Sequence, residues 1–268
     1  MKLPNRINEI SLDTSINTGC YPLDGFLTFY EGECGGDCFG LYWEYGKEHI
    51  QEPIVCQMYH DEGKLIPAFS NLDKFLEWWE ISDYGWEEVE IEDKNFINYF
   101  LKKGDECLKQ NKIEQSIEYY IKSINSCSEI SEVWCKLASL YKRMDNELAY
   151  QQAVINSILS NWSFGFPSQN AIRMLKSLRP FEEIKNHPLI IHRNNLDFKF
   201  GGTKENPNYH TMKKIIDELS EIDKHKSLLM EHNYALMMYW ETTAFQERYN
   251  FDYSKWKEDF KVKTIRVV

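Results

Sequence analysis

The sequence predicts an α+β protein, with a small antiparallel sheet and packed helices first and an all-α helical-repeat region after it. Three observations support this fold class. Large apolar residues, mostly aromatic, recur at every second position over 39–45, two apolar runs within 53–69 flank a glycine-containing turn, and a 34-residue helical periodicity follows residue 95. We therefore expect an α+β domain over 1–93, a helical repeat pair over 94–165 and a helical capping region over 166–268.

Composition supports a globular protein. The chain has 268 residues, of which 43% are hydrophobic and 15% aromatic, enough to bury a sizeable core in one or two domains. No apolar run reaches the length of a signal peptide core or a membrane span, so we expect a cytoplasmic protein without a membrane partner. The seven cysteines are odd in number and scattered, which favours free thiols over a disulfide framework.

The strands of the first domain are indicated by alternation. Phe39, Leu41, Trp43 and Tyr45 share one face of an extended segment, as in a half-buried strand. The runs 53–60 and 65–69 are joined by a turn that contains a glycine, which predicts a β-hairpin.

A helix is expected directly after the hairpin. Ser70 or Asn71 can cap it, and the apolar positions that follow recur at helical spacing, so one stripe should pack on the sheet. These positions are Leu72, Phe75, Leu76 and Trp79.

Residues 35–79 resemble the core of the SUKH superfamily, which includes fungal cell-wall-synthesis regulators and bacterial immunity proteins of polymorphic toxin systems. The matching features, in order, are "GD" followed by "GLYW", then "EPIV", "HDEG", "LIPAFS" and "FLEWW". Full-length members have helices before the sheet, and here the short stretches 4–10 and 21–32 stand in their place. The resemblance implies a non-catalytic protein that binds and blocks a toxin, often a basic nuclease.

A second pattern resembles the tetratricopeptide repeat. Phe100, Gly104 and Cys107 are followed 34 residues later by Trp134, Ala138 and Tyr141. Ser116 and Tyr120 take the small and bulky positions of a second helix in the first unit. In the second unit Tyr150 stands where a small residue is expected. Helical patterns at 168–178 and 208–249 could cap the pair, with 201–208 as a loop between them.

Charge is distributed unevenly along the chain. Residues 1–95 contain 6 basic and 20 acidic residues, a net charge of −14, whereas residues 96–268 contain 25 and 22, a net charge of +3. Such a field repels nucleic acid and attracts a basic protein, although an acidic surface can also serve solubility alone.

A zinc centre and a catalytic centre are both disfavoured. Cys34, Cys38, Cys56 and His60 are the ligand types that zinc prefers. However, Cys56 and His60 would lie roughly 13 Å apart along a strand, too far for one metal ion. His60 at an acidic turn could act as a general base, but no nucleophile, phosphate-loop or paired-histidine motif accompanies it. We therefore predict no metal, no cofactor and no catalytic residues.

The sequence thus favours a protein-binding role. An immunity protein that neutralises a basic toxin comes first, a regulatory scaffold that uses helical repeats comes second, and an enzyme with an unrecognised site near His60 comes third. We expect the partner to meet carboxylates on exposed loops and an exposed tryptophan of the helix. The candidate residues are Glu44, Glu48, Glu52, Asp61, Glu62, Trp78 and Trp79.

Overall fold

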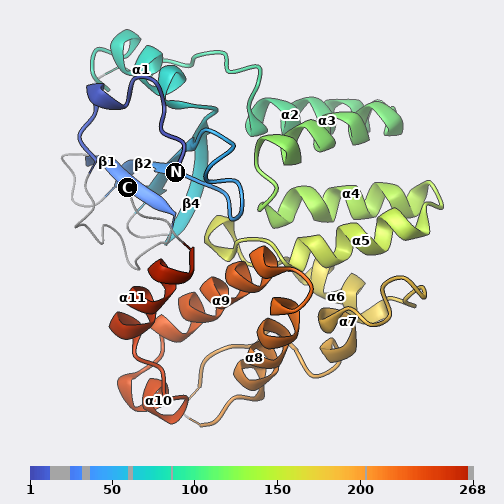
Figure 1. Ribbon diagram of the computed structural model, residues 1–268. Helices are drawn as coiled ribbons and strands as arrows, with labels where there is room; N and C mark the ends of the chain where they lie inside the picture. Colours follow the sequence, from blue (N-terminus) through green and yellow to red (C-terminus); the bar gives the residue numbers. More distant parts are fainter. Residues whose placement is uncertain (13–24, 32–36, 60–62, 86, 203, 265–268) are drawn as a thin grey trace. The chain divides into compact units, whose positions relative to one another are not determined.

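The computed structural model describes residues 1–12, 25–31, 37–59, 63–85, 87–202 and 204–264 (Figure 1). The chain divides into two compact units, residues 1–128 and residues 129–267. The division falls inside the range 94–165 that we assigned to a repeat pair. Each unit is described by itself below.

The first unit contains a four-stranded antiparallel sheet in the order β1-β2-β3-β4. The strands are β1 (Phe26–Glu31), β2 (Cys38–Tyr42), β3 (Ile54–Tyr59) and β4 (Lys64–Phe69). Pairing of β3 with β4, from Val55 opposite Phe69 to Tyr59 opposite Lys64, confirms the predicted hairpin.

Strand β1 corrects the expectation for residues 21–32, which we had taken to replace an N-terminal helix. Phe26 pairs with Tyr42 and Leu27 with Leu41, so this stretch extends the sheet. Phe26 and Thr28 are buried, while Leu27 and Phe29 pack on the core cluster from the opposite face. Because large apolar side chains occur on both faces, the strand lacks the period-two pattern from which a strand was predicted over 39–45.

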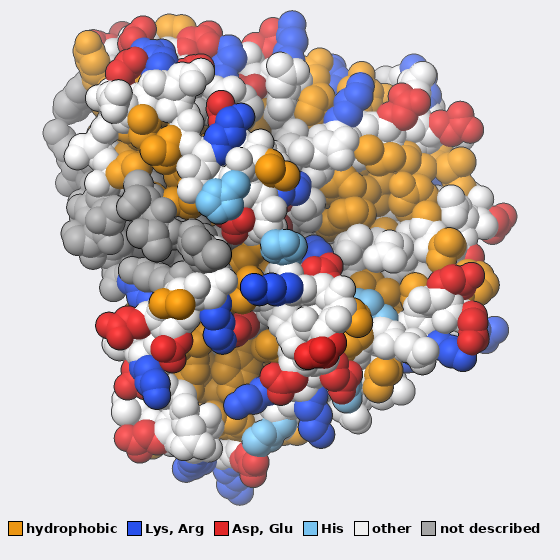
Figure 2. Space-filling model, in the orientation of Figure 1, with side chains coloured by type: hydrophobic (Ala, Val, Ile, Leu, Met, Phe, Trp, Pro, Cys, Tyr) orange, Lys and Arg blue, Asp and Glu red, His pale blue; other side chains and the backbone are white. Residues whose placement is uncertain are grey.

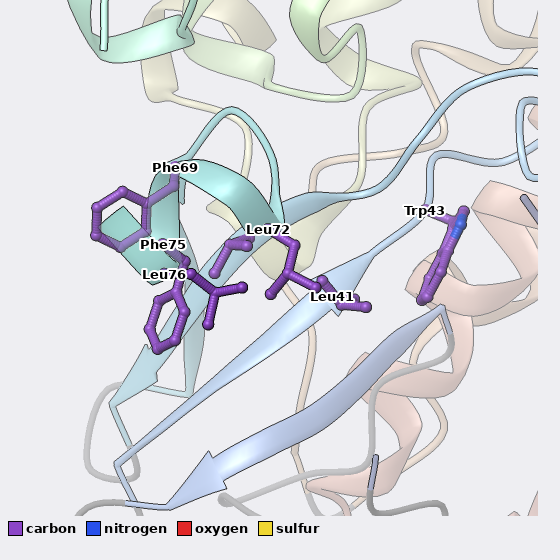
Figure 3. Close-up of a cluster of buried hydrophobic side chains, with 7 residues drawn as sticks. Leu41, Trp43, Phe69, Leu72, Phe75 and Leu76 are labelled. Atoms are coloured by element: carbon purple, nitrogen blue, oxygen red, sulfur yellow. The ribbon is translucent and has the colours of Figure 1, made fainter. Parts of the chain in front are cut away.

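Helix α1 (Leu72–Ile81) packs against β3 and β4, as the apolar stripe predicts. It begins at Asn71, whose side-chain oxygen accepts from the backbone N–H of Lys74 at 2.9 Å. Figure 3 shows its buried side chains beside Leu41 of β2 and Trp43. The core cluster consists of Leu41, Trp43, Val55, Phe69, Leu72, Phe75 and Leu76.

Two helical hairpins reproduce the 34-residue period. Helix α2 (Ile97–Lys109) packs on α3 (Ile113–Ser126) in the first unit, and α4 (Ser131–Arg143) packs on α5 (Glu147–Ile158) in the second. Helices α2 and α4 begin 34 residues apart, as do α3 and α5.

The turns inside the two hairpins are also equivalent. Asn111 and Asp145, 34 residues apart, both adopt left-handed backbone conformations, with φ of 59° and 54°. In each turn the next residue's N–H donates to the carbonyl five residues before it, Lys112 to Cys107 at 2.9 Å and Asn146 to Tyr141 at 3.0 Å. The two hairpins therefore share local geometry as well as period.

The regular secondary structure in the described part of the second unit is all helical. After α5 come a short 3₁₀ turn, η2 (Trp162–Phe164), and the helices α6 (Gln169–Ser177), α7 (Pro188–His192), α8 (Pro207–Ser220), α9 (Lys224–Tyr239), α10 (Thr243–Arg248) and α11 (Tyr253–Thr264). Helix α9 packs on α8 and α11, and an aromatic cluster forms around Tyr209, Met238 and Phe245. The patterns at 168–178 and 208–249 are helical, as expected. Among the described residues no helix combines the length and apolar character needed to cross a bilayer.

Helix α7 carries a pH-sensitive cap. The Nδ1 atom of His187 accepts from the backbone N–H of Leu189 at 3.2 Å, which requires an unprotonated ring nitrogen. Burial lowers the pKa of His187, while Asp223 acts weakly in the opposite direction. The folded chain therefore resists protonation more than the unfolded chain does. The contribution is present above the ordinary histidine pKa of about 6.5 and is lost progressively as the pH falls from there through the lowered pKa of the folded chain.

We predict that acidification from about pH 7.5 to about pH 5.5 destabilises the wild type more than a His187→Asn variant, because asparagine caps a helix without titrating in this range. The difference should be about 1 kcal/mol, the usual contribution of a side-chain cap. Thermal unfolding of both proteins at the two pH values measures it. Equal losses in the two proteins would show that the His187 cap is not the titrating element.

Candidate functional site

Two of the predicted partner-binding carboxylates are buried, which corrects the expectation that they are exposed. Glu44 is only 6% exposed. Its Oε1 accepts from Nζ of Lys47 at 2.9 Å, and its Oε2 accepts from the backbone N–H and hydroxyl of Ser128 at 2.7 and 2.6 Å. Glu48 is 8% exposed, and its carbonyl accepts from the N–H of Lys2 at 2.6 Å. The loop after β2 therefore folds inward, so these acids cannot meet a partner.

The other predicted acidic residues do not form a cluster within the described part of the chain. Glu52 is half-exposed and lies 3.5 Å from Nζ of Lys2 in a solvent-facing ion pair. Asp61 and Glu62 lie outside the described residues. Of the acidic residues predicted around the strand loops, only Glu52 is accessible within the described part of the chain.

Trp78 and Trp79 are both half-buried, and both pack on the core cluster. The Trp78 ring contacts Phe39, Phe69 and Phe75, and its Nε1 donates to the carbonyl of Val89 at 3.1 Å. We expected an accessible tryptophan on this helix, and both rings are partly accessible.

Trp79 stacks on Phe75, with ring centroids 5.8 Å apart and an interplanar angle of 18°. Tyr30 and Tyr84 meet the ring edge to face, at 4.6 and 6.0 Å, and Trp78 lies tilted against it at 6.0 Å. Aromatic contacts of this kind fix the ring orientation. The second tryptophan is therefore held firmly while part of its surface stays open.

An acidic surface does exist, but in a different place. We define residues 87–92, which follow α1 without regular secondary structure, as the acidic segment. Val89 and Ile91 are half-buried, Ile91 against the core cluster, and the glutamates alternate with them outward. Asp93 fixes the far end, because its Oδ2 accepts from the N–H of Ser70 at 2.7 Å. The exposed carboxylates are Glu87, Glu88, Glu90 and Glu92.

Among the described residues, most of these carboxylates have no ion-pair partner. Glu92 pairs with Lys94 at 2.9 Å. Within the described part of the chain, no lysine or arginine lies within ion-pair distance of Glu87, Glu88 or Glu90. Three like charges spaced along an extended segment repel one another, and a cationic partner would relieve that repulsion.

A groove of about 800 Å³ lies beside the acidic segment. Aromatic side chains from β4, α1 and the start of α2 line it, together with Glu90, Glu92, Lys94, Lys102 and Lys103. Lys103 pairs with Glu106 at 2.8 Å. The groove thus joins Trp78, a predicted anchor, to the first helix of the predicted repeat pair. Its aromatic lining consists of Phe69, Trp78, Phe96 and Tyr99.

The edge strand beside the groove is protected against pairing with another strand. Strand β4 is at one end of the sheet and contains Pro67, which has no N–H to donate. The Pro67 carbonyl accepts from the side-chain amide of Asn98 at 3.0 Å. A partner would therefore meet side chains in this groove rather than add a strand to the sheet.

The possible zinc ligands are only partly described. Cys38 and Cys56 lie on the neighbouring strands β2 and β3 and are buried, while Cys34 and His60 lie outside the described residues. Burial raises the pKa of Cys56 well above its ordinary value, which disfavours the thiolate that a metal requires. In the described ranges, no three histidine, cysteine, aspartate or glutamate side chains gather as metal ligands do.

Comparison with known proteins identifies the family. Residues 11–88 match the family described as "YfbP N-terminal domain", and residues 199–268 match "YfbP C-terminal domain". The chain is 38% identical over 268 residues to "Uncharacterized protein YfbP" of Escherichia coli strain K12, an alignment that covers 97% of this chain and 95% of the relative. No solved structure matches. Because the identity extends over almost the full length of both proteins, the chain belongs to the YfbP family.

Proposed function

We propose that this chain is a non-catalytic immunity protein that binds and neutralises a basic toxin. The observation that carries the proposal is the acidic segment, which exposes Glu87, Glu88 and Glu90 beside an aromatic groove that contains Trp78. Carboxylates steer a basic protein during encounter, and half-buried aromatic side chains supply contact area once it is bound. The SUKH resemblance of residues 35–79 supports a toxin as that protein.

A regulatory scaffold is the alternative role. The paired hairpins with a shared 34-residue period favour it, because helical repeats commonly present surfaces to protein partners. Tyr99, Lys102 and Lys103 of α2 line the same groove, so the proposed partner would contact the first hairpin in either role. The two roles differ in the partner. In the first role it is a toxin, and the gene that encodes it would lie beside the gene for this chain.

The test is a kinetic binding assay with the product of the neighbouring gene. We predict that the triple variant Glu87→Lys, Glu88→Lys, Glu90→Lys associates about tenfold or more slowly than wild type at low salt, with a smaller difference above physiological ionic strength. Dissociation should change less. The three side chains are exposed, so the thermal unfolding temperature should stay the same.

A matched control carries the same change of charge on the second compact unit. Glu221, Glu247 and Glu258 are exposed there, and their replacement by lysine should leave association much closer to wild type. Equal slowing in both triple variants would mean that only net charge matters. Unchanged association at both salt concentrations would overturn the acidic segment as the binding surface, and a neighbouring product that does not bind would favour the scaffold role.

A further inference from the structure

The turn that ends α1 has an unusual backbone. Asp83, Tyr84 and Gly85 are consecutive, and all three are in the left-handed region, with φ of 50°, 59° and 89°. Glycine adopts this conformation freely, and aspartate is tolerated there. For a tyrosine it costs about 1–2 kcal/mol, because its Cβ approaches the backbone. The turn therefore keeps a bulky residue where a smaller one would fit with less strain.

Several hydrogen bonds fix the conformation of this turn. Ser82 is fully buried, and its hydroxyl donates to the carbonyl of Trp79 at 3.2 Å and accepts from the N–H of Gly85 at 3.1 Å. The N–H of Tyr84 donates to the same Trp79 carbonyl at 2.9 Å, and the N–H of Glu87 donates to the Ser82 carbonyl at 2.9 Å. The acidic segment thus begins from a fixed point beside Tyr84.

Burial does not account for Tyr84. The residue is 61% exposed, and its ring meets Trp79 at 6.0 Å with an interplanar angle of 80°. Gly85 also lies against Trp79, since a Cβ at that position would come within 3.0 Å of the indole. The turn is therefore seated on Trp79, while most of the tyrosine surface faces solvent. An exposed aromatic ring held on a strained, well-bonded turn is suited to contact with a partner.

Acidic residues flank Tyr84 along the chain. Asp83 and Glu87 are exposed on either side of it, and Glu80 is exposed on the preceding turn of α1, 3.7 Å from Arg6. Figure 2 shows acidic, basic and hydrophobic side chains interleaved along its upper margin, over α1 and the segment that leads to α2. An aromatic face beside carboxylates suits a guanidinium group, which can stack on the ring and donate to carboxylate oxygens at once.

We infer that Tyr84, with Asp83 and Glu87, forms a preformed site for an arginine side chain of the basic partner. This inference rests on the proposed function and adds to it the chemistry of one contact. Lysine fits less well, because its compact ammonium group is strongly hydrated and cannot stack as a plane. The site therefore distinguishes arginine-rich from lysine-rich surfaces of equal charge.

The test titrates the full chain with fluorescent oligo-arginine and oligo-lysine peptides of equal length. Tyr84→Asn removes the ring but keeps a residue that tolerates left-handed backbone, so the unfolding temperature should change little. We expect it to weaken oligo-arginine binding about two- to fivefold, the range of an exposed cation–π contact, and oligo-lysine binding less. Tyr84→Phe should retain wild-type affinity, and Phe181→Ala, which removes another exposed aromatic ring, should have no effect.

The outcomes separate this inference from the proposed function. If Tyr84→Asn leaves both affinities unchanged, or lowers both equally, while the Glu87, Glu88 and Glu90 triple lysine variant weakens both peptides, the arginine site is wrong and the acidic surface stands. If neither peptide binds, or the triple variant binds as wild type does, both proposals fail. A loss confined to oligo-arginine, restored by phenylalanine, supports the arginine site.

Discussion

Replacement of Glu44 by alanine is expected to lower the free energy of unfolding by about 3 kcal/mol, because it removes a buried carboxylate that accepts two hydrogen bonds from Ser128 and pairs with a half-buried lysine. The Glu44 side chain is 5% exposed, and it meets Lys47 through one oxygen and Ser128 through the other. Its loss would leave the Ser128 N–H and hydroxyl without their acceptor, and hydrogen bonds to a charged group contribute about 1.5–3 kcal/mol. The carboxylate also joins the loop after β2 to the residue that follows the C-cap of α3.

Glu52 provides the matched control for this change. It is the same residue type on the same loop region, but its ion pair with Lys2 is exposed to solvent. Glu52→Ala should therefore cost less than about 1 kcal/mol. Glu44→Gln, which keeps one acceptor oxygen, should fall between the two. Chemical denaturation of the three variants gives the comparison, and similar losses for Glu44→Ala and Glu52→Ala would contradict the buried role of Glu44.

The pair Glu44 and Ser128 also explains why sequence reasoning misplaced two of the site residues. Acids between strands are usually exposed, so a loop position alone suggested an accessible surface. The groups that make burial of Glu44 tolerable are Lys47, three residues away, and Ser128, 84 residues away in sequence. The second contact depends on tertiary structure, which no local pattern reveals. Trp78, in contrast, was predicted as one of two candidate anchors on the helix, and it does line the groove.

The acidic segment could have been found from sequence. In "EEVEIED" the apolar residues Val89 and Ile91 alternate with glutamates, the pattern of an extended segment with one face on the core. The stretch lies at the end of the α+β domain predicted over 1–93, and its alternation is short. The turn at 82–85 could not have been found in this way. Asp83 and Tyr84 both have left-handed backbone conformations, which residues other than glycine seldom adopt.

The fold was predictable where one face is buried and the other is not. The hairpin β3–β4, helix α1 and the 34-residue helical period all carry clear periodicity, and all are present. Strand β1 was missed because it is apolar on both faces. The 34-residue period shows in the sequence that the two hairpins are related. The structure shows in addition that their inner positions are packed differently.

Gly104 occupies one such inner position in the first hairpin. It is buried in α2, and its carbonyl accepts from the Ser116 hydroxyl of α3 at 2.9 Å. A Cβ at this position would lie closer than 3.0 Å to the ring of Tyr120. That ring is fully buried, and its hydroxyl donates to the Asp105 carboxylate, so it has little freedom to move. In the second hairpin the corresponding positions hold Ala138 and Val154, both fully buried.

The first hairpin therefore combines glycine with tyrosine at these two positions, whereas the second combines alanine with valine. We expect the effect of a substitution at one position on stability to depend on the residue at the other. We predict that Gly104→Ala destabilises the wild type by about 2 kcal/mol through overpacking. Tyr120→Val should cost about 3 kcal/mol or more, because it opens a cavity and removes the hydrogen bond to Asp105.

In the Tyr120→Val background, Gly104→Ala should change sign and stabilise the protein by about 1 kcal/mol. The clash with the ring is then absent, alanine partly fills the space, and it favours a helix interior over glycine by about that amount. Equilibrium denaturation of the wild type, the two single variants and the double variant measures this cycle. Ala138→Gly should destabilise in any background, since it only opens space. If Gly104→Ala had the same effect with and without Tyr120, the close approach of the ring to α2 would not be what requires glycine at this position.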